Sequence, residues 1–445
     1  MKTLNPFTYL LFPFYIEKSM DYQHLSLSPI WTRGKVITEN TDDKYRKGIA
    51  YSYIQDYFQM FVGNRPNDNV SNIMIMSLDD TEKQFDNWLE ECLCFKNPKN
   101  GKTIEFGICY KQNSFDTIKL LINQVAGIGL LVIPISVRAN IDDFRDFIYF
   151  IRQTALSSIW KKDEEESKKW NLNSIVKKLL KEFEGHYSRF NDELVLHLSF
   201  LAVDTTRIDD TIKSAIISMT RGDMKDVSNG NTRLGQIEVS DDLYIASSIE
   251  GTVVLTLSNW GNTKETEKET ILRYRIEQTE RYMIYLLIVM QRYSLIKIVQ
   301  ELSQIRGLLT ESNNNTIRSL REIARTVSLI RIENYFSIIS DYSVYNEFYQ
   351  ICCSSYCIDK LYTEIEQKMS VLNSYLTQQS NESREKAEWQ LAIIAAILTV
   401  FSATNDVSQL LKGGVKQPWL FCIVSVFAII IVAFLFNAII KNIRR

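Results

Sequence analysis

The sequence WLFCIVSVFAIIIVAFLFNAII, residues Trp419–Ile440, is a run of 22 residues without a charged side chain. A helix of about 20 apolar residues is long enough to cross the ~30 Å hydrocarbon core of a bilayer. A tryptophan at one end of the run and three basic residues in the tail, 441–445, are typical of the two membrane–water interfaces. The run therefore predicts a transmembrane helix at 419–440.

A second apolar run precedes this one. Leu391–Ala403 reads LAIIAAILTVFSA, and it reaches spanning length when it is extended to 389–411. Polar residues at 404–406 lie near its far end, and at membrane depth such groups usually face protein or a water-filled cavity. The link 412–418 contains two glycines and a proline, so we expect the two spans to form a hairpin. More basic residues flank the hairpin than lie in its link, which places both termini in the cytoplasm.

The region before the hairpin is predicted to be a helical stalk, 263–388. Between Gly307 and Gly413 there is no glycine or proline, the two residues that most often end helices. Isoleucine or leucine recurs every seven residues at 358, 365 and 372, as in coiled-coil packing. The polar segment Thr310–Thr316 predicts a turn between two antiparallel helices. A last helix is expected to begin near Asp341 and to continue unbroken into the membrane.

The first 262 residues are predicted to be a cytoplasmic α/β domain with a mixed sheet, because short β-rich runs alternate with helical patterns. The expected strands are Thr8–Ile16, Asn72–Leu78, Thr103–Tyr110, Gly129–Val137, Glu193–Val203 and Tyr244–Leu257. The expected helices are Lys44–Phe61, Thr81–Phe95, Asp116–Ala126 and Ile141–Ile159. The charge run Lys161–Lys169 is interpreted as a solvated helix end. The whole chain is thus expected to be an α+β membrane protein.

Residues that would carry catalysis are sparse. There are three histidines, and no P-loop, dinucleotide glycine fingerprint, nucleophile elbow or His-Glu-x-x-His pair occurs, so no enzymatic activity is predicted. His197 is interpreted as an ordinary sheet residue. A net charge of −2 without a clustered basic face argues against direct nucleic-acid binding. The acidic pairs are interpreted as turn or helix-cap residues rather than metal ligands: Asp79–Asp80, Asp142–Asp143, Asp209–Asp210 and Asp241–Asp242.

Two further sets of residues leave alternatives open. Five N-terminal basic residues either bind an anionic ligand or are plain surface charges: Arg33, Lys35, Arg46, Lys47 and Arg65. The seven cysteines lack paired metal-site spacing and are interpreted as reduced thiols of a cytosolic compartment, three of them in a helical pattern: Cys352, Cys353 and Cys357.

An α/β domain, a long helical stalk and a C-terminal two-helix hairpin with a basic tail together resemble the CorA family of magnesium channels. The stretch Tyr356–Thr404, which runs through YLTQQSNESREKAEWQLAIIAAILTVFSAT, looks like that family's junction between stalk and first span, and the resemblance covers 270–445. It implies a homopentamer in a bacterial inner membrane, with the first transmembrane helix, 389–411, lining the pore.

The sequence departs from the family at its signature. The family carries Gly-Met-Asn at the outer end of the first span, where this chain reads Ala403-Thr404-Asn405-Asp406. Asn405 stands in the place of the asparagine, but glycine and methionine are absent, so selective magnesium uptake does not follow. Asp406 is either a carboxylate ring that attracts cations or an interfacial helix-end residue. The pore face implied by the resemblance carries Leu391, Ala395, Leu398, Ser402, Asn405 and Asp406. A packing stripe between helices would have the same spacing.

Divergent CorA-like proteins without the signature are membrane effectors of type III CRISPR antiviral systems. The resemblance to that group implies a channel gated by a nucleotide second messenger, such as an S-adenosylmethionine–AMP conjugate, that binds the soluble domain. One alternative is a CorA-type magnesium transporter with a degenerate filter, in which Mg²⁺ is the permeant or regulatory ion. A membrane-anchored scaffold or enzyme without conduction is the third hypothesis. Neither the ligand contacts nor a metal site follows from the sequence.

Overall fold

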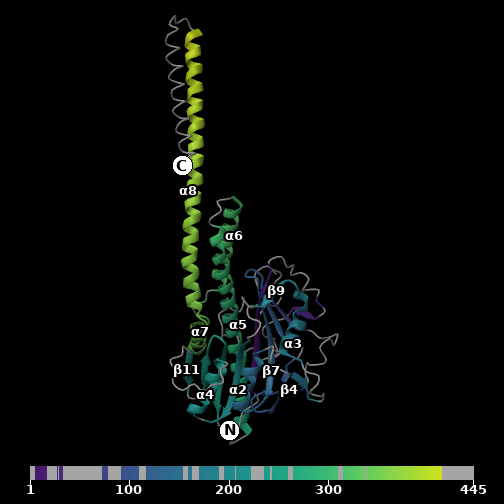
Figure 1. Ribbon diagram of the computed structural model, residues 1–445. Coiled ribbons are helices and arrows are strands. Elements are labelled where there is room, and N and C mark those ends of the chain that lie inside the picture. Colours follow the sequence, from purple (N-terminus) through teal and green to yellow (C-terminus); the bar gives the residue numbers. More distant parts are fainter. Residues whose placement is uncertain are drawn as a thin grey trace. The chain divides into compact units, whose positions relative to one another are not determined.

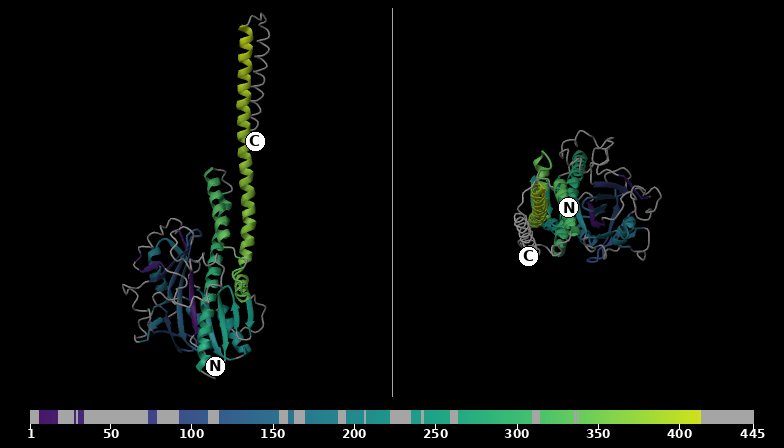
Figure 2. Two further views of the ribbon diagram at one scale, coloured as in Figure 1. Left: turned by 180° about the vertical axis from the view of Figure 1, so that it is seen from behind. Right: turned by 90° about the horizontal axis from the view of Figure 1, so that it is seen from above.

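The chain folds into a mixed α+β structure, described here from a computed structural model (Figures 1 and 2). The described residues are 6–17, 28, 30–33, 73–78, 92–109, 117–153, 159–162, 170–189, 195–205, 207–221, 235–240, 243–258, 264–308, 314–334, 336 and 338–412. The chain divides into two compact units, Met1–Lys368 and Met369–Arg445.

One sheet of 13 strands organises the first unit among the described residues. Its strands are β1 (Phe7–Ile16), β2 (Trp31–Arg33), β3 (Ile73–Leu78), β4 (Leu93–Lys96), β5 (Thr103–Ile108), β6 (Lys119–Asn123), β7 (Ile128–Arg138), β8 (Ile159–Lys161), β9 (Tyr187–Arg189), β10 (Leu196–Asp204), β11 (Gly235–Ser240), β12 (Leu243–Ser247) and β13 (Gly251–Ser258). The main path runs β11-β12-β13-β10-β1-β7-β5-β4-β8. β10 and β13 pair in parallel and the other pairs are antiparallel, so the predicted mixed sheet is confirmed.

Prolines lie inside the two central strands, where each marks a change of neighbour. A proline cannot donate to a strand ladder, so it is normally excluded from the middle of a sheet. On its edge away from β7, β1 pairs with β10 up to Leu11 and with β9 from Phe14, and Pro13 falls in the gap. On its edge away from β1, β7 pairs with β6 up to Val132 and with β5 from Ile135, and Pro134 falls in that gap.

The described helices are α2 (Ile141–Ile151), α3 (Leu172–Leu179), α4 (Asp210–Arg221), α5 (Lys264–Leu308), α6 (Asn314–Asn334), α7 (Ser343–Ser355) and α8 (Ile358–Lys412), with a 3-10 turn, η2, at Lys181–Phe183. Of these, α2, α3, α4, α5 and α7 cover the two faces of the sheet. Phe12 and Phe14 of β1 belong to the core that α2, α3 and α4 close, whereas Tyr9 stacks on Tyr282 of α5. α7 packs beside α5 and over β11 and β12. Because both faces are covered, the central strands are apolar at nearly every position.

All six predicted strands are present, the last of them as the hairpin β12–β13. The helix predicted at Asp116–Ala126 is wrong, because its apolar run KLLIN forms the fully buried strand β6 between β3 and β7. The helix predicted at Ile141–Ile159 ends at Ile151, and its last residue begins β8. Of the helix predicted at Thr81–Phe95, the last three residues belong to strand β4, and 81–91 lie outside the described residues. Short apolar runs do not separate strand from helix, which only pairing with neighbours decides.

Other predicted helical features fall partly outside the described residues. The helix predicted at Lys44–Phe61 lies wholly outside them, as does most of the Lys161–Lys169 charge run, whose first residue ends β8. α5 and α6 pack against each other and are separated by 309–313, which confirms a helix pair divided at the polar TESNNNT segment. The heptad positions Ile358, Ile365 and Leu372 are all buried.

The unbroken helix predicted from Asp341 into the membrane is wrong. α7 ends at Ser355 and α8 begins at Ile358, with Cys357 between them in the left-handed region (φ 56°). No glycine or proline marks this break, and contacts described below hold it. Beyond it, α8 continues without interruption to Lys412.

One described helical segment is long and apolar enough to cross a bilayer, Glu277–Gln304 of α5, and 72% of its most apolar window is buried inside the protein. It is the core helix that packs on the sheet, and it is not one of the two predicted spans. The backbone of the first predicted span, 389–411, lies in α8, but most of its side chains fall outside the described residues. The second, 419–440, lies wholly outside them, so both spans stay predictions.

Candidate functional site

The predicted pore-face positions lie along α8. Because the backbone is helical throughout, their spacing by three and four places Leu391, Ala395 and Leu398 on one face. Leu391 is 66% exposed and Ala395 is also exposed. The side chains at 398, 402, 405 and 406 fall outside the described residues. The large apolar side chains Ile394 and Trp389 on the same helix are exposed as well, which is unusual for a soluble protein surface.

α8 is joined to the α/β domain through the α7–α8 junction. The Tyr356 amide donates to the Cys352 carbonyl (2.8 Å) and the Cys357 amide to Ser354 (3.1 Å), so α7 closes with a tight turn. The Tyr356 carbonyl, which would otherwise be an orphan at a helix end, accepts from the Arg292 guanidinium of α5. The same guanidinium lies 5.5 Å from the centre of the Tyr356 ring. The break in the helix is therefore fixed by α5.

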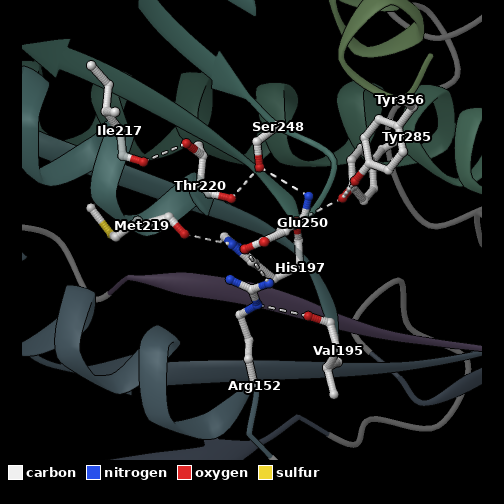
Figure 3. Close-up of polar contacts among 10 residues, drawn as sticks. All are labelled: Arg152, Val195, His197, Ile217, Met219, Thr220, Ser248, Glu250, Tyr285 and Tyr356. Atoms are coloured by element: carbon white, nitrogen blue, oxygen red, sulfur yellow. Dashed lines mark hydrogen bonds and ion pairs between the residues drawn. The ribbon is translucent and has the colours of Figure 1, made fainter. Parts of the chain in front are cut away.

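The Tyr356 side chain extends this attachment into the sheet (Figure 3). Its phenol oxygen forms a hydrogen bond with the Tyr285 phenol of α5, and Tyr285 donates to the His197 carbonyl of β10 (2.9 Å). Each phenol carries one proton, so Tyr356 donates to Tyr285 and Tyr285 to the strand. Burial is the main cause that raises the pKa of both phenols, and both stay protonated at physiological pH. The start of α8 is thereby hydrogen-bonded, through two residues, to a central strand.

On the opposite face of the sheet, the His197 side chain is the centre of a buried polar cluster. Its Nε2 lies 3.1 Å from the Met219 carbonyl, which can only accept, so Nε2 carries the proton. Its Nδ1 therefore accepts from the Ser199 hydroxyl (2.9 Å), which in turn lies 2.9 Å from the Thr8 hydroxyl of β1. Burial and the nearby Arg152 charge lower the pKa of His197 well below its ordinary value. The imidazole is neutral at physiological pH.

Gly251 of β13 leaves space for this imidazole, and the end of α4 binds it. Gly251 of β13 lies opposite His197 in the parallel pair, and a Cβ there would stand 2.2 Å from Nε2. The Met219 carbonyl belongs to the last turn of α4, where helical carbonyls lack intrahelical donors. The Thr220 carbonyl of the same turn accepts from Ser248 in the β12–β13 turn. The cluster therefore anchors the end of α4 to the sheet.

Arg152, at the end of α2, connects this cluster to the surface (Figure 3). Its Nε donates to the Val195 carbonyl (2.9 Å), and its Nη2 lies 3.1 Å from a carboxylate oxygen of Glu250. The arginine side chain is 3% exposed and the glutamate side chain 38%, so the carboxylate is the accessible end of the cluster. Arg152 and Glu250 were not singled out from the sequence, because a single charged side chain does not indicate which distant residue it will contact.

The Ser199–His197 pair has the hydrogen bond of a nucleophile with its base, but neither side chain has any exposed surface. A substrate does not reach it, so the pair acts within the core. His197 is thus a buried sheet residue, as predicted.

Two of the acidic pairs are helix-terminal, as predicted. Asp142 and Asp143 lie in the first turn of α2, and Asp209 caps α4 by accepting from the Ile212 amide (2.7 Å). The other two acidic pairs, and the N-terminal basic residues apart from Arg33 in β2, lie outside the described residues. Among the residues that the structure describes, no three His, Cys, Asp or Glu side chains are grouped so that they could hold a metal ion.

The described cysteines are free thiols, as expected. Cys352 and Cys353 lie in α7, and burial raises the pKa of Cys352 to about 12, so this thiol is inert. The helical position predicted for Cys357 is wrong, since it forms the junction.

No protein-family model matches the chain, and no curated protein matches it.

Proposed function

We propose that the chain is a subunit of a CorA-like homo-oligomeric channel of a bacterial inner membrane, gated by a nucleotide second messenger as an effector of type III CRISPR antiviral defence. The observation that carries the proposal is the apolar surface of α8. Trp389, Leu391 and Ile394 are 47%, 66% and 53% exposed, and they lie in the part of α8 that is the first predicted membrane span. Apolar surface of this kind requires lipid or other copies of the helix.

The α7–α8 junction supports the gating part of the proposal. A ligand opens a channel only if it binds one arrangement of the protein better than another. The buried cluster joins α2, α4 and β10. From β10, hydrogen bonds through Tyr285 lead to Tyr356, the last residue before the break between α7 and α8. A messenger such as an S-adenosylmethionine–AMP conjugate, bound to the α/β domain, would shift α8 through this hydrogen-bonded connection.

Ion flux through liposomes that contain the full-length protein tests the proposal. We expect little flux without nucleotide and a large increase when the S-adenosylmethionine–AMP conjugate is present on the cytoplasmic side. Robust magnesium flux without nucleotide, stopped by cytoplasmic Mg²⁺, would instead identify the CorA-type transporter. No flux in either condition, from protein of verified orientation, would contradict both.

A pair of variants tests the pore face. If Leu398 forms a hydrophobic constriction, Leu398→Ser should conduct without ligand, because a polar ring lowers the cost of wetting the pore. Ile397→Ser is the matched control: it makes the same kind of change one position away, on another face of the helix. Equal flux from the two variants would contradict the assignment of Leu391, Ala395, Leu398, Ser402, Asn405 and Asp406 to the pore.

A further inference from the structure

Cys357 differs from the rest of the described chain, where it is the one non-glycine residue with a positive φ (56°). It directly follows Tyr356, the capping residue of α7, at the position where a helix often ends in glycine. The left-handed conformation crowds the Cβ of an L residue against the backbone, which glycine avoids because it has no Cβ. The α7–α8 junction is therefore strained at Cys357, and such strain persists only where neighbouring contacts impose it.

The contacts that impose the turn at Cys357 meet at the residue before it. The Arg292 guanidinium of α5 donates to the Tyr356 carbonyl and lies 5.5 Å from the centre of the Tyr356 ring. The Tyr285 phenol, also of α5, is hydrogen-bonded to the Tyr356 phenol. In an uninterrupted α-helix the Tyr356 carbonyl would instead accept from the amide of Lys360, four residues later. Arg292 thus takes the acceptor that would otherwise join α7 to α8.

A single helix through the junction is compatible with the local sequence. No glycine or proline lies between Gly307 and Gly413, and Cys357 would have an ordinary conformation inside a helix. The amides at 358–360 are the first of α8, so they lack the carbonyls of a preceding helical turn. In a continuous helix they would gain acceptors at 354–356. The strain at Cys357 and these three amides therefore favour joining the two helices.

Packing at the start of α8 opposes that alternative. Ile358 and Ile365 are 3% and 2% exposed, and straightening the chain at Cys357 would change the direction of α8 and withdraw this face from its neighbours. The same residues begin the seven-residue repeat 358, 365 and 372, a spacing that suits packing against helices of other copies of the chain. Each arrangement thus has contacts that the other lacks, as a two-state element requires.

We propose that this junction is a strained latch, in which the contact of Arg292 with Tyr356 holds Cys357 in the left-handed turn. Loss of that contact lets α7 and α8 join into one helix. Every residue of the latch lies in the first unit, and α8 is one helix as far as Lys412, so the change at Cys357 acts on the whole helix. In the channel of the proposed function the latch is an autoinhibitory contact. That consequence rests on the proposed function, whereas the latch itself does not.

Hydrogen exchange of the full-length protein in detergent, read by mass spectrometry at 358–360, tests the latch. The double variant Arg292→Met, Cys357→Ala should slow exchange of these amides about tenfold, because alanine favours a helix and the competing donor is gone. The matched variant Arg292→Met, Cys357→Gly loses the same contact, but glycine takes the left-handed turn without strain and disfavours a helix interior. Its amides should exchange as in the unmodified protein. Arg275→Met, at an exposed arginine of α5, should change nothing.

Equal exchange at 358–360 in the alanine and glycine double variants would overturn the proposal, and so would faster exchange in both. If Arg292→Met prevents folding, the single variants decide. Cys357→Gly should then unfold at a higher temperature than Cys357→Ala, and the opposite order, which an ordinary helical position gives, would overturn the proposal. Slowed exchange without liposome flux would uphold the latch and contradict only the channel. Nucleotide-gated flux from protein whose two double variants exchange alike would do the reverse.

Discussion

The phenol of Tyr356, the last residue before the left-handed break at Cys357, is hydrogen-bonded to the phenol of Tyr285 in the middle of α5. Tyr285 in turn donates to the main-chain carbonyl of His197 (2.9 Å). The His197 side chain lies in the buried polar cluster on the opposite face of the sheet. Both rings are fully buried. A short connection therefore crosses the sheet from the end of α4 to the start of α8.

Removing the hydroxyl group of Tyr285 or of Tyr356 should destabilise the protein by about 1–3 kcal/mol, because the buried partner loses a hydrogen bond that solvent does not replace. Tyr285→Phe should cost more than Tyr356→Phe, since it also removes the hydrogen bond to the His197 carbonyl. The double variant should cost less than the sum of the two. Thermal unfolding of the detergent-purified protein measures this, and Tyr342→Phe, at an exposed tyrosine, is the control. Strict additivity would contradict the pairing.

His197 should make stability depend on pH below neutrality. Burial lowers the pKa of His197 in the folded protein, whereas in the unfolded chain it titrates near 6.5. Below that value the unfolded chain takes up a proton that the folded protein does not, so stability falls as the pH falls, by up to about 1.4 kcal/mol per pH unit. Above it, both states are neutral and the effect vanishes.

The difference between His197→Gln and the unmodified protein isolates this effect from other titrations. We expect unfolding temperatures of the variant to change less between pH 7.5 and pH 5. The same substitution at His186, whose side chain is half exposed, should leave the pH dependence of the unmodified protein intact. A parallel pH profile for His197→Gln would show that this imidazole does not stay neutral in the fold.

Gly251→Ala should disrupt the packing of His197 against β13. The added Cβ would stand 2.2 Å from a ring nitrogen that is confined by Ser199 and Met219. Overpacking of this kind costs about 1–3 kcal/mol. Gly101→Ala is a control with open space, and its positive φ alone should cost about 1 kcal/mol. Equal unfolding temperatures for the two variants would contradict the confinement of the ring.

The buried Arg281 of α5 should be replaceable only together with Glu277. Its Nε lies 2.5 Å from a Glu277 oxygen, and its guanidinium lies 5.1 Å from the Phe348 ring centre. Among the residues that the structure describes, its two Nη atoms have no hydrogen-bond partner. Arg281→Met alone leaves a mostly buried carboxylate without its partner, which destabilises strongly. Adding Glu277→Gln should restore most of the unfolding temperature. A double variant no more stable than Arg281→Met would show that the guanidinium contributes more than its charge.

Much of the architecture could be predicted from local sequence. The division between α5 and α6 and the buried positions Ile358, Ile365 and Leu372 followed from apolar spacing and from polar breaks, as did strands β1, β3, β5, β7 and β10 and the hairpin β12–β13. These signals are readable because each arises within one segment of chain. The length and the lack of charge of the apolar run 419–440 are also visible in the sequence alone, and the transmembrane helix that they indicate stays a prediction.

Only the tertiary structure decided which residues form the buried cluster and the α7–α8 junction. His197 meets Met219, Arg152 meets Glu250, and Tyr356 meets Tyr285 across separations of tens of residues that no local pattern encodes. KLLIN became a strand because β3 and β7 offered partners on both edges. The helix expected to run unbroken from Asp341 ends at Ser355, because contacts from α5 hold a turn that neither glycine nor proline announces.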